Sequence, residues 1–284
     1  MNPLPIPAGK QGHPAPPGAA HPQEVRHMSQ SIALITGASS GLGQEYVRQL
    51  SRDPKVQEIW AIARRKDRLE ALSTLAACPV RAIPLDLTRQ ESLDTLRDLL
   101  AQEQPVVTRL VCAAGFGKMG NIAAVDPGDN LAMIDLNCWA AVGVTGLCLP
   151  YLTRGSRVLE ICSTAAFQPM PGLGVYAATK AFLHSYAKTL HHELLPKGIH
   201  VTAVCPYWVK DTEFIPLAQE GKAGQFHHFP LASRSKSVVS LSLAASAVNL
   251  WVATPGIVCT LHRVAAKFIP HCLMVPLMEL FRRL

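Results

Sequence analysis

Short apolar runs alternate with longer helical stretches along the chain from Ser31 onward. The apolar and β-branched runs predict seven strands, at 32–35, 58–63, 80–85, 109–113, 157–162, 200–204 and 250–253. Helical patterns fill the intervals, at 42–50, 67–75, 90–102, 128–152, 175–194 and in the first part of 237–261. Because strands that alternate with helices are joined by crossovers, we expect a parallel sheet with helices on both faces. The predicted fold class is α/β, a doubly wound sheet in a single domain.

The composition indicates a large buried core. Of the 284 residues, 49% are hydrophobic and 17% are charged, which excludes a disordered protein and a small disulfide scaffold. Residues 1–28 are rich in proline and lack the apolar centre of a signal peptide, so we expect a flexible tail there. Residues 29–284 are expected to form one folded domain.

The cysteines and the charge limit the partners that we expect. None of the eight cysteines forms a CxxC pair or a zinc-type Cys/His spacing, and most lie in apolar runs, so we predict no metal site and a reducing, cytoplasmic compartment. The net charge of +7 suits an anionic membrane, nucleic acid or a phosphorylated ligand. Because no dense basic run is present, we predict no nucleic-acid partner.

Two apolar segments near the C-terminus raise the question of a membrane. Residues 237–261 carry no charge, but Asn249, Pro255 and Gly256 interrupt them, so we do not predict a membrane span. The helical tail at 260–284 mixes apolar and basic residues. We favour packing of this tail on the body or on a neighbouring subunit over contact with a membrane surface.

A glycine-rich turn follows the first strand and opens the first helix. Its sequence is Thr36-Gly37-Ala38-Ser39-Ser40-Gly41-Leu42-Gly43. Glycines permit a tight turn and a close approach to a pyrophosphate, and the helix N-terminus offers free N–H groups. In a strand–turn–helix context this pattern predicts dinucleotide binding.

Arg64 and Arg65 stand at the end of the second strand, where an acidic residue would bind the ribose 2′-hydroxyl of NAD(H). A carboxylate there would repel a 2′-phosphate, whereas a guanidinium group pairs with it. The sequence therefore predicts NADP(H) as the cofactor.

Tyr176 and Lys180 are spaced i and i+4 in a helical stretch, so they share one helix face. A phenol with a pKa near 10 is a poor proton donor and acceptor at neutral pH unless a cation stabilises the phenolate. We expect the Lys180 ammonium to supply that charge. Ser163, at the end of a predicted strand, could donate a hydrogen bond to a substrate oxygen.

Several motifs occur in one order: the glycine turn, Asp86, Asn137, Ser163, and Tyr176 with Lys180. In this order the chain resembles the short-chain dehydrogenase/reductase family, in its single-domain branch, over about residues 31–212. The resemblance implies a Rossmann-type sheet and a hydride transfer in which Tyr176 is the acid/base. It also implies that Asn137 holds a water in a proton relay and that Asp86 contacts the adenine.

The expected site residues follow from the motifs and the resemblance. The catalytic set is Asn137, Ser163, Tyr176 and Lys180. The cofactor contacts are Gly37, Ser39, Ser40, Gly41, Leu42, Gly43, Arg64, Arg65, Asp86, Leu87, Ala114, Gly115, Tyr176, Lys180, Pro206 and Val209. The substrate contacts are Ser163, Tyr176, Tyr207, Trp208 and Phe214.

The sequence departs from the family pattern in two places. The family's Asn-Asn-Ala-Gly is here Cys112-Ala113-Ala114-Gly115, which removes side-chain amides but leaves room beside the cofactor. The family's Pro-Gly is Pro206-Tyr207, and the threonine that follows, Thr212, is displaced by one residue. All four catalytic positions are present, so we expect an active enzyme.

We predict an NADP(H)-dependent oxidoreductase that acts on a carbonyl or secondary alcohol. The expected lid, residues 207–233, is rich in aromatic residues, including Phe226 and Phe229, which favours an apolar, bulky substrate such as a steroid-like ketone. A 3-oxoacyl thioester reductase is the alternative. A cofactor-binding scaffold or redox sensor without turnover, a sugar-nucleotide epimerase and a membrane-surface enzyme are less favoured. The resemblance also implies a homo-oligomer, a dimer or a tetramer.

Overall fold

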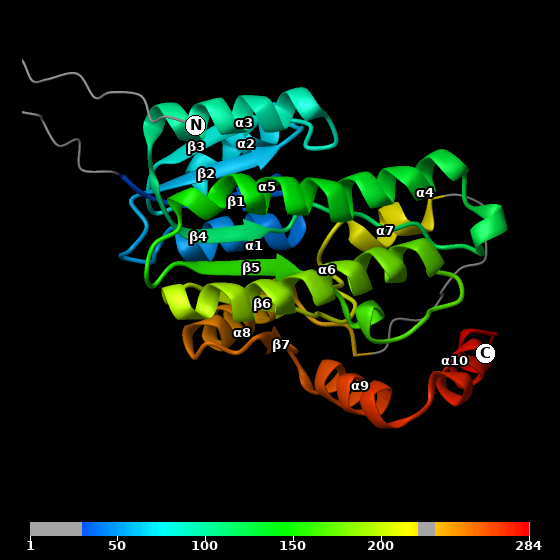
Figure 1. Cartoon of the computed structure of the whole chain (residues 1–284). Helices are drawn as coiled ribbons and strands as arrows, with labels where there is room; N and C mark the ends of the chain where they lie inside the picture. Colours follow the sequence, from blue (N-terminus) through cyan, green and yellow to red (C-terminus); the bar gives the residue numbers. More distant parts are fainter. Residues whose placement is uncertain (1–29, 221–230, 284) are drawn as a thin grey trace, which may run out of the picture.

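The computed structural model describes residues 30–220 and 231–283. Its centre is a sheet of seven parallel strands in the order β3-β2-β1-β4-β5-β6-β7 (Figure 1). The strands are β1 (Ser31–Thr36), β2 (Glu58–Ala63), β3 (Val80–Pro84), β4 (Val106–Cys112), β5 (Arg157–Ile161), β6 (His200–Val204) and β7 (Val252–Ala253). The predicted doubly wound parallel sheet is therefore confirmed.

Helices connect the strands and cover the sheet. The α-helices are α1 (Gly41–Leu50), α2 (Lys66–Glu70), α3 (Gln90–Glu103), α4 (Pro127–Ile134), α5 (Ala140–Cys148), α6 (Gly174–Leu194), α7 (Phe214–Gln219), α8 (Ser235–Ala247), α9 (Ile257–Phe268) and α10 (His271–Arg283). Short 3₁₀ turns are η1 (Ala71–Thr74), η2 (Ile122–Ala124), η4 (Leu149–Tyr151), η5 (Thr164–Phe167) and η6 (Leu195–Lys197), and η3 (Asp135–Trp139) is a π-helix.

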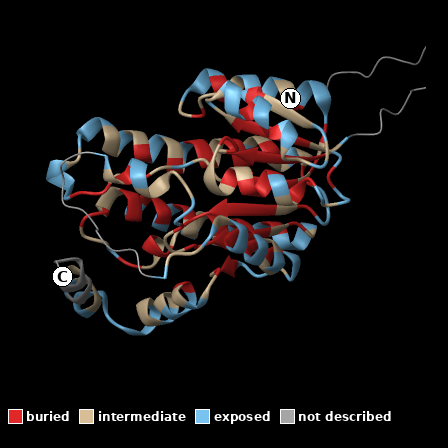
Figure 2. Ribbon diagram, turned by 180° about the vertical axis from the view of Figure 1, so that it is seen from behind, coloured by how far each residue is buried: buried red, intermediate tan, exposed pale blue. Residues whose placement is uncertain are grey.

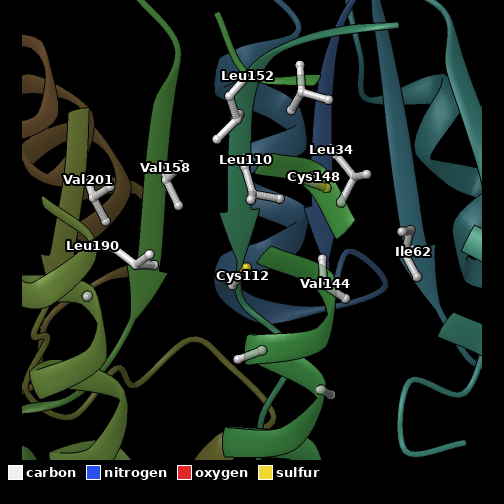
Figure 3. Packing of buried hydrophobic residues seen from close by; sticks show 14 of the residues in the cluster. Leu34, Ile62, Leu110, Cys112, Val144, Cys148, Leu152, Val158, Leu190 and Val201 are labelled. Carbon is white, nitrogen blue, oxygen red and sulfur yellow. The ribbon is translucent and has the colours of Figure 1, made fainter. Parts of the chain in front are cut away.

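The core has two layers because alternate strand residues point to opposite faces of the sheet. On one face, Leu34 and Leu110 pack with α3, α5 and α6, and Figure 3 shows this layer around Val144 and Cys148. On the other face, Ile35 packs with α1, α2 and α8. The strands are buried on both faces, whereas the outer helix faces are exposed (Figure 2).

The strand order reverses between β1 and β4, so the loops that leave these two strands run to opposite sides of the sheet. In doubly wound sheets the crevice at such a point, beyond the carboxyl ends of the strands, is the place where ligands bind. The Thr36 hydroxyl accepts a hydrogen bond of 3.1 Å from the Ala114 N–H, which joins the two strand ends across this crevice. The sheet therefore directs the glycine turn and the Ala114 loop toward one site.

The predicted helix at 128–152 differs from the structure. It begins at Pro127, capped by the Asp126 side chain, and the π-helix η3 divides it into α4 and α5. The stretch Pro127–Tyr151 is long and apolar enough to cross a membrane by length and composition, but its α5 part packs on the sheet as a core helix does.

The C-terminal helices α9 and α10 extend from the edge of the body beyond β7 (Figure 1). Helix α9 begins at Ile257, three residues before the predicted tail. The expected N-terminal tail and the lid residues 221–230, which include Phe226 and Phe229, lie outside the described residues. Within the part of the chain that is described, no group of three or more His, Cys, Asp or Glu side chains could hold a metal ion.

Candidate active site

A cavity of about 1280 Å³ lies at the carboxyl ends of the strands. It runs from the glycine turn, past the end of β4, to the segment after β6 and to the C-terminal helices. The predicted site residues that line it are Gly37, Ser39, Ser40, Gly41, Leu42, Gly43, Arg64, Arg65, Asp86, Leu87, Ala114, Gly115, Ser163, Tyr176, Lys180, Tyr207, Trp208, Val209 and Phe214. Asn137 and Pro206 do not line it.

The glycine turn is packed so tightly that side chains would not fit. Gly37 has φ +65°, and a Cβ there would lie 2.8 Å from the backbone of Ala113 and Ala114. A Cβ on Gly43 would lie 2.2 Å from the Gly37 carbonyl oxygen. Glycine at these two positions therefore lets α1 begin close to the ends of β1 and β4, so that the helix N-terminus lines the cavity, where a pyrophosphate would bind.

The end of β2 supplies the positive charge of the site. The Arg65 guanidinium donates to the Ser39 hydroxyl from Nη2 at 3.2 Å, while Arg64 is exposed at the cavity wall. Glu213, after β6, pairs with Arg65 at 3.0 Å and with Arg68 at 2.5 Å. The sequence pattern gave no signal for Glu213, because its partners are about 145 residues away in the chain.

Tyr176, Ser163 and Lys180 meet at the centre of the cavity. Tyr176 and Lys180 lie on α6 and are both buried, and Ser163 follows β5. The Lys180 ammonium donates to the Ile161 carbonyl at 2.8 Å and lies 5.8 Å from the centroid of the Tyr176 ring. The Ser163 Oγ accepts from the Ala165 N–H at 3.1 Å, which fixes the serine at the start of η5.

The pKa of Tyr176 shifts in the direction opposite to the expected one. Burial raises the pKa of the phenol well above its ordinary value of 10.0, although a hydrogen bond with Ser163 lowers it. Burial also lowers the pKa of Lys180. The Lys180 ammonium donates its hydrogen bond to the Ile161 carbonyl and not to the phenol oxygen. Desolvation therefore has the largest effect on the pKa of Tyr176.

Asn137 lies on the π-helix η3 and is fully buried behind the cavity. Its Oδ1 accepts from the Phe116 N–H at 3.0 Å, and its Nδ2 donates to the Phe116 carbonyl at 2.9 Å and to the Thr179 hydroxyl at 3.0 Å. Thr179 in turn donates to the Tyr176 carbonyl at 2.7 Å. The asparagine side chain therefore connects the loop after β4 to the turn of α6 that holds Tyr176.

The loop after β4 approaches the catalytic side chains closely. A Cβ on Gly115 would lie 2.8 Å from the Asn137 Oδ1, and a Cβ on Gly117 would lie 2.8 Å from the Tyr176 ring. Gly117 and Phe116 line the cavity and were not among the expected residues. The family-type motif ends at Gly115, so only the fold reveals their position.

Aromatic side chains form the far end of the cavity. The Phe214 ring lies 5.3 Å from the Tyr176 ring and 6.3 Å from the Trp208 ring, measured between centroids. Three further residues of this wall, Val258, His262 and Met274, come from α9 and α10 and were not expected. The far end is thus mostly apolar, with the C-terminal helices as one wall.

Two other predicted positions have structural roles of their own. Asp86 accepts from the Thr88 hydroxyl at 2.7 Å and from the Thr88 N–H at 3.1 Å, which fixes the loop after β3. The displaced Thr212 lines the cavity and donates to the Val209 carbonyl at 2.9 Å. Thr212 is close enough to the glycine turn that a Cβ on Gly41 would touch its side chain at 3.4 Å.

Comparison with known proteins places these features in context. The model of the short chain dehydrogenase family matches residues 31–222. An uncharacterized oxidoreductase of Staphylococcus epidermidis is 26% identical, over 78% of this chain and 95% of that protein. An 11-beta-hydroxysteroid dehydrogenase of Pinus massoniana is 30% identical (64% of this chain, 52% of that one), and a very-long-chain 3-oxoacyl-CoA reductase of Bos taurus is 28% identical (68% and 64%).

A solved structure agrees in fold over most of both chains. A short-chain dehydrogenase from Sphingobium yanoikuyae, in complex with NADPH, is 26% identical with a TM-score of 0.73, and the match covers 86% of this chain and 94% of that one.

Proposed function

The chain belongs to the short-chain dehydrogenase family of oxidoreductases, and we propose that it transfers a hydride between NADP(H) and the carbonyl or alcohol group of an apolar, fairly bulky substrate. One observation carries this proposal. The glycine turn, the two arginines, and the Ser163, Tyr176 and Lys180 side chains face one continuous cavity. Its volume of about 1280 Å³ exceeds that of a typical small-molecule site, roughly 300–1,000 Å³, which leaves room for a dinucleotide and a second molecule.

The residues present fit NADP(H). The N–H groups of the glycine turn at the start of α1 would donate to the pyrophosphate, and Arg64 and Arg65 would donate to a 2′-phosphate. Ser39 already holds the Arg65 guanidinium at the cavity wall. The related Sphingobium yanoikuyae enzyme is described in complex with NADPH, which supports the same cofactor here.

The chemistry divides between the cofactor and the protein. The nicotinamide, when bound, supplies or accepts the hydride. In the direction of reduction, Tyr176 donates its Oη proton to the carbonyl oxygen, and the Ser163 hydroxyl donates a hydrogen bond that stabilises the charge developing there. Burial raises the pKa of Tyr176, which keeps the phenol protonated but makes it a weaker acid, so positive charge near the ring is needed to favour the proton transfer. Lys180 adds positive charge near the phenol, and Asn137 keeps the turn of α6 in place.

The walls of the cavity favour an apolar substrate. Tyr207, Trp208 and Phe214 would contact it beside Tyr176, and Met170 and Leu173 add apolar surface. Among the relatives, one is named a hydroxysteroid dehydrogenase and one a very-long-chain 3-oxoacyl-CoA reductase. A steroid-like ketone is our first choice of substrate class, and a long 3-oxoacyl thioester is the second.

The test is turnover of NADPH, followed by its absorbance, against ketones of three kinds: polycyclic ketones, 3-oxoacyl thioesters and small diketones. We expect NADPH oxidation with one of the first two kinds and weak activity with small diketones. A preference for small diketones would contradict the substrate class. Nucleotide binding without oxidation of NADPH on any ketone, or of the matching alcohols with NADP⁺, would indicate a scaffold without turnover.

Subunit association and a cytoplasmic location belong to this proposal as well. Large apolar side chains on the α4–α6 helices are exposed, including Leu131, Ile134 and Phe182. Such a surface suits a second copy of the chain, as a homodimer or a homotetramer. Sedimentation of the purified protein measures the number of subunits, and a monomer at micromolar concentration would contradict the association.

A further inference from the structure

Glu213 forms an ion triad with two arginines at the phosphate end of the cavity. Its Oε2 lies 3.0 Å from Arg65 Nη2, and its Oε1 lies 2.5 Å from Arg68 Nη1. The three side chains are about 40% exposed, with Arg65 and Arg68 held from the α2 side and Glu213 from the segment after β6. The triad therefore joins the two sides of the cavity through charge-assisted hydrogen bonds.

Arg65 cannot pair fully with both the Glu213 carboxylate and a cofactor phosphate. Its guanidinium already donates to Ser39 and to Glu213, and it stands where a 2′-phosphate would bind. A phosphate monoester carries a charge of about −1.5 to −2 at pH 7, so a carboxylate on the same guanidinium repels it. Arg68 offers Glu213 a second partner that does not line the cavity. When phosphate engages Arg65, Glu213 can retain Arg68 only.

The chain also connects Glu213 directly to the substrate end of the cavity. Glu213 directly precedes Phe214, the first residue of α7, whose ring packs against Tyr176 and Trp208. At the far end of α7, the Ala218 carbonyl accepts from the Met119 N–H at 2.8 Å, which anchors the helix to the loop after β4. Because that end is anchored, a displacement of Glu213 would be taken up at the Phe214 end of α7.

We propose that Glu213 is a specificity-determining residue, which competes with the 2′-phosphate of the cofactor for Arg65 and links phosphate binding to the position of Phe214. The inference rests on the proposed use of NADP(H). It predicts that the wild-type chain binds phosphate-bearing nucleotides less tightly than its arginines allow, and that Glu213 has no such effect on nucleotides without the phosphate.

The first test compares two probes, 2′,5′-ADP and 5′-AMP, by calorimetry on the full chain. Glu213→Gln should tighten 2′,5′-ADP binding by about threefold to tenfold at low salt, as expected for loss of one nearby exposed charge, and leave 5′-AMP unchanged. The gain should shrink at about 1 M salt, where the Debye length is near 3 Å. Glu220→Gln is the matched control, because Glu220 lies in the same segment but its carboxylate pairs with Lys118 and not with an arginine of the triad.

A double-mutant cycle tests the role of Arg68. Arg68→Ala leaves Glu213 with Arg65 as its partner, so it should weaken 2′,5′-ADP binding in the wild-type background. In the Glu213→Gln background the same change should have a much smaller effect. Equal losses in both backgrounds would overturn the competition, because Arg68 would then act on the phosphate directly.

The link to Phe214 has its own readout. Trp208 lies against Phe214, so 2′,5′-ADP should change the tryptophan fluorescence of the wild type more than that of Glu213→Gln, and Trp208→Phe should abolish the change. Equal fluorescence changes in the two proteins would overturn the link.

The outcomes separate this inference from the cofactor assignment. If 2′,5′-ADP binds no better than 5′-AMP to the wild type and to Glu213→Gln alike, NADP(H) is the wrong cofactor. If 2′,5′-ADP is preferred but Glu213→Gln and Glu220→Gln both bind like the wild type, the cofactor stands and the competition is refuted.

Discussion

Glu160 is a carboxylic acid buried in the centre of the fold. It lies on β5, where its Oε1 accepts from the Thr145 hydroxyl at 2.8 Å and its Oε2 has no hydrogen-bond partner among the residues that the structure describes. Burial raises its pKa from 4.5 to about 7, although the hydrogen bond with Thr145, the nearby Cys112 thiol and the charge of Lys180 lower it. A buried, half-satisfied carboxylate costs stability whenever it is ionised.

The sign of the pH effect follows from this shift. The folded chain holds the Glu160 proton more tightly than the unfolded chain does. Protonated Glu160 therefore makes its full contribution to the free energy of unfolding below about pH 4.5, and this contribution is lost as the pH rises through 7. Glu160→Gln removes this dependence. Above pH 7, its free energy of unfolding should exceed that of the wild type by up to about 3 kcal/mol, and the advantage should vanish near pH 4.5.

Urea unfolding at several pH values measures this difference. Glu193→Gln, which removes an exposed carboxylate on α6, is the control and should follow the wild type. A Glu160→Gln curve parallel to the wild type between pH 5 and 8 would mean that Glu160 does not titrate in this range.

Tyr176 is the residue on which the chemistry depends most. Tyr176→Phe removes the proton donor but keeps the ring that packs against Phe214. Turnover should fall by about 10²–10⁴-fold, the usual contribution of general acid–base catalysis, while NADPH affinity stays the same. Steady-state kinetics and NADPH fluorescence titration measure the two quantities. A variant that turns over at the wild-type rate would exclude Tyr176 as the donor.

At the scale of elements, the π-helix η3 is what places Asn137. One extra residue in this turn is accommodated between α4 and α5, and single π-turns of this kind are frequent at functional sites. The turn brings the Asn137 amide within hydrogen-bonding distance of the Phe116 backbone and of Thr179. A local bulge in one helix thus fixes a loop and a second helix.

Asn137→Ala should destabilise the fold because it leaves the Phe116 N–H and carbonyl without their partner. A fully buried unsatisfied group costs about 1–3 kcal/mol, and because the Phe116 backbone groups are only partly buried, we expect a total loss of about 1–3 kcal/mol. Thermal unfolding measures the loss, and Asn121→Ala, at an exposed site just before η2, is the control. Equal melting temperatures for Asn137→Ala and the wild type would show that the Asn137 amide does not contribute to the stability of the fold.

The elements divide into those that local sequence determines and those that it does not. The strands, the glycine turn and the i, i+4 relation of Tyr176 and Lys180 follow from short-range patterns, and the structure contains them, although β4 begins three residues before the predicted strand and β7 begins two residues after it. The π-helix does not, because the contact that accompanies it joins Asn137 to a loop about twenty residues away in the chain. The pKa of Tyr176 was expected in the wrong direction, because burial depends on packing that no local pattern encodes.

At the scale of the whole molecule, the cavity is completed by the end of the chain. Val258 and His262 on α9 and Met274 on α10 line the wall opposite the sheet, although α9 and α10 extend from the edge of the body (Figure 1). His262 also packs its ring edge-on against Phe167, with centroids 5.8 Å apart. The substrate end therefore depends on residues more than 80 positions after Tyr176, whereas the phosphate end is built mainly from the first third of the chain, to which the segment after β6 adds Thr212 and Glu213.

Because the two ends of the cavity come from different parts of the chain, removal of α10 should affect substrate binding and leave nucleotide binding unchanged. A chain that ends at Ile269 loses α10 and with it Met274, while every fully buried core residue that the structure describes remains, since none lies beyond Cys259. We expect KM for a polycyclic ketone to rise by about threefold to tenfold, the effect of losing part of one methionine contact. KM for a small diketone and the affinity for 2′,5′-ADP should stay the same. A matching rise for both ketones would mean that α10 supports the fold of the site instead of its size. An unchanged KM for the polycyclic ketone would place that substrate away from the C-terminal wall, against Tyr207 and Trp208 alone.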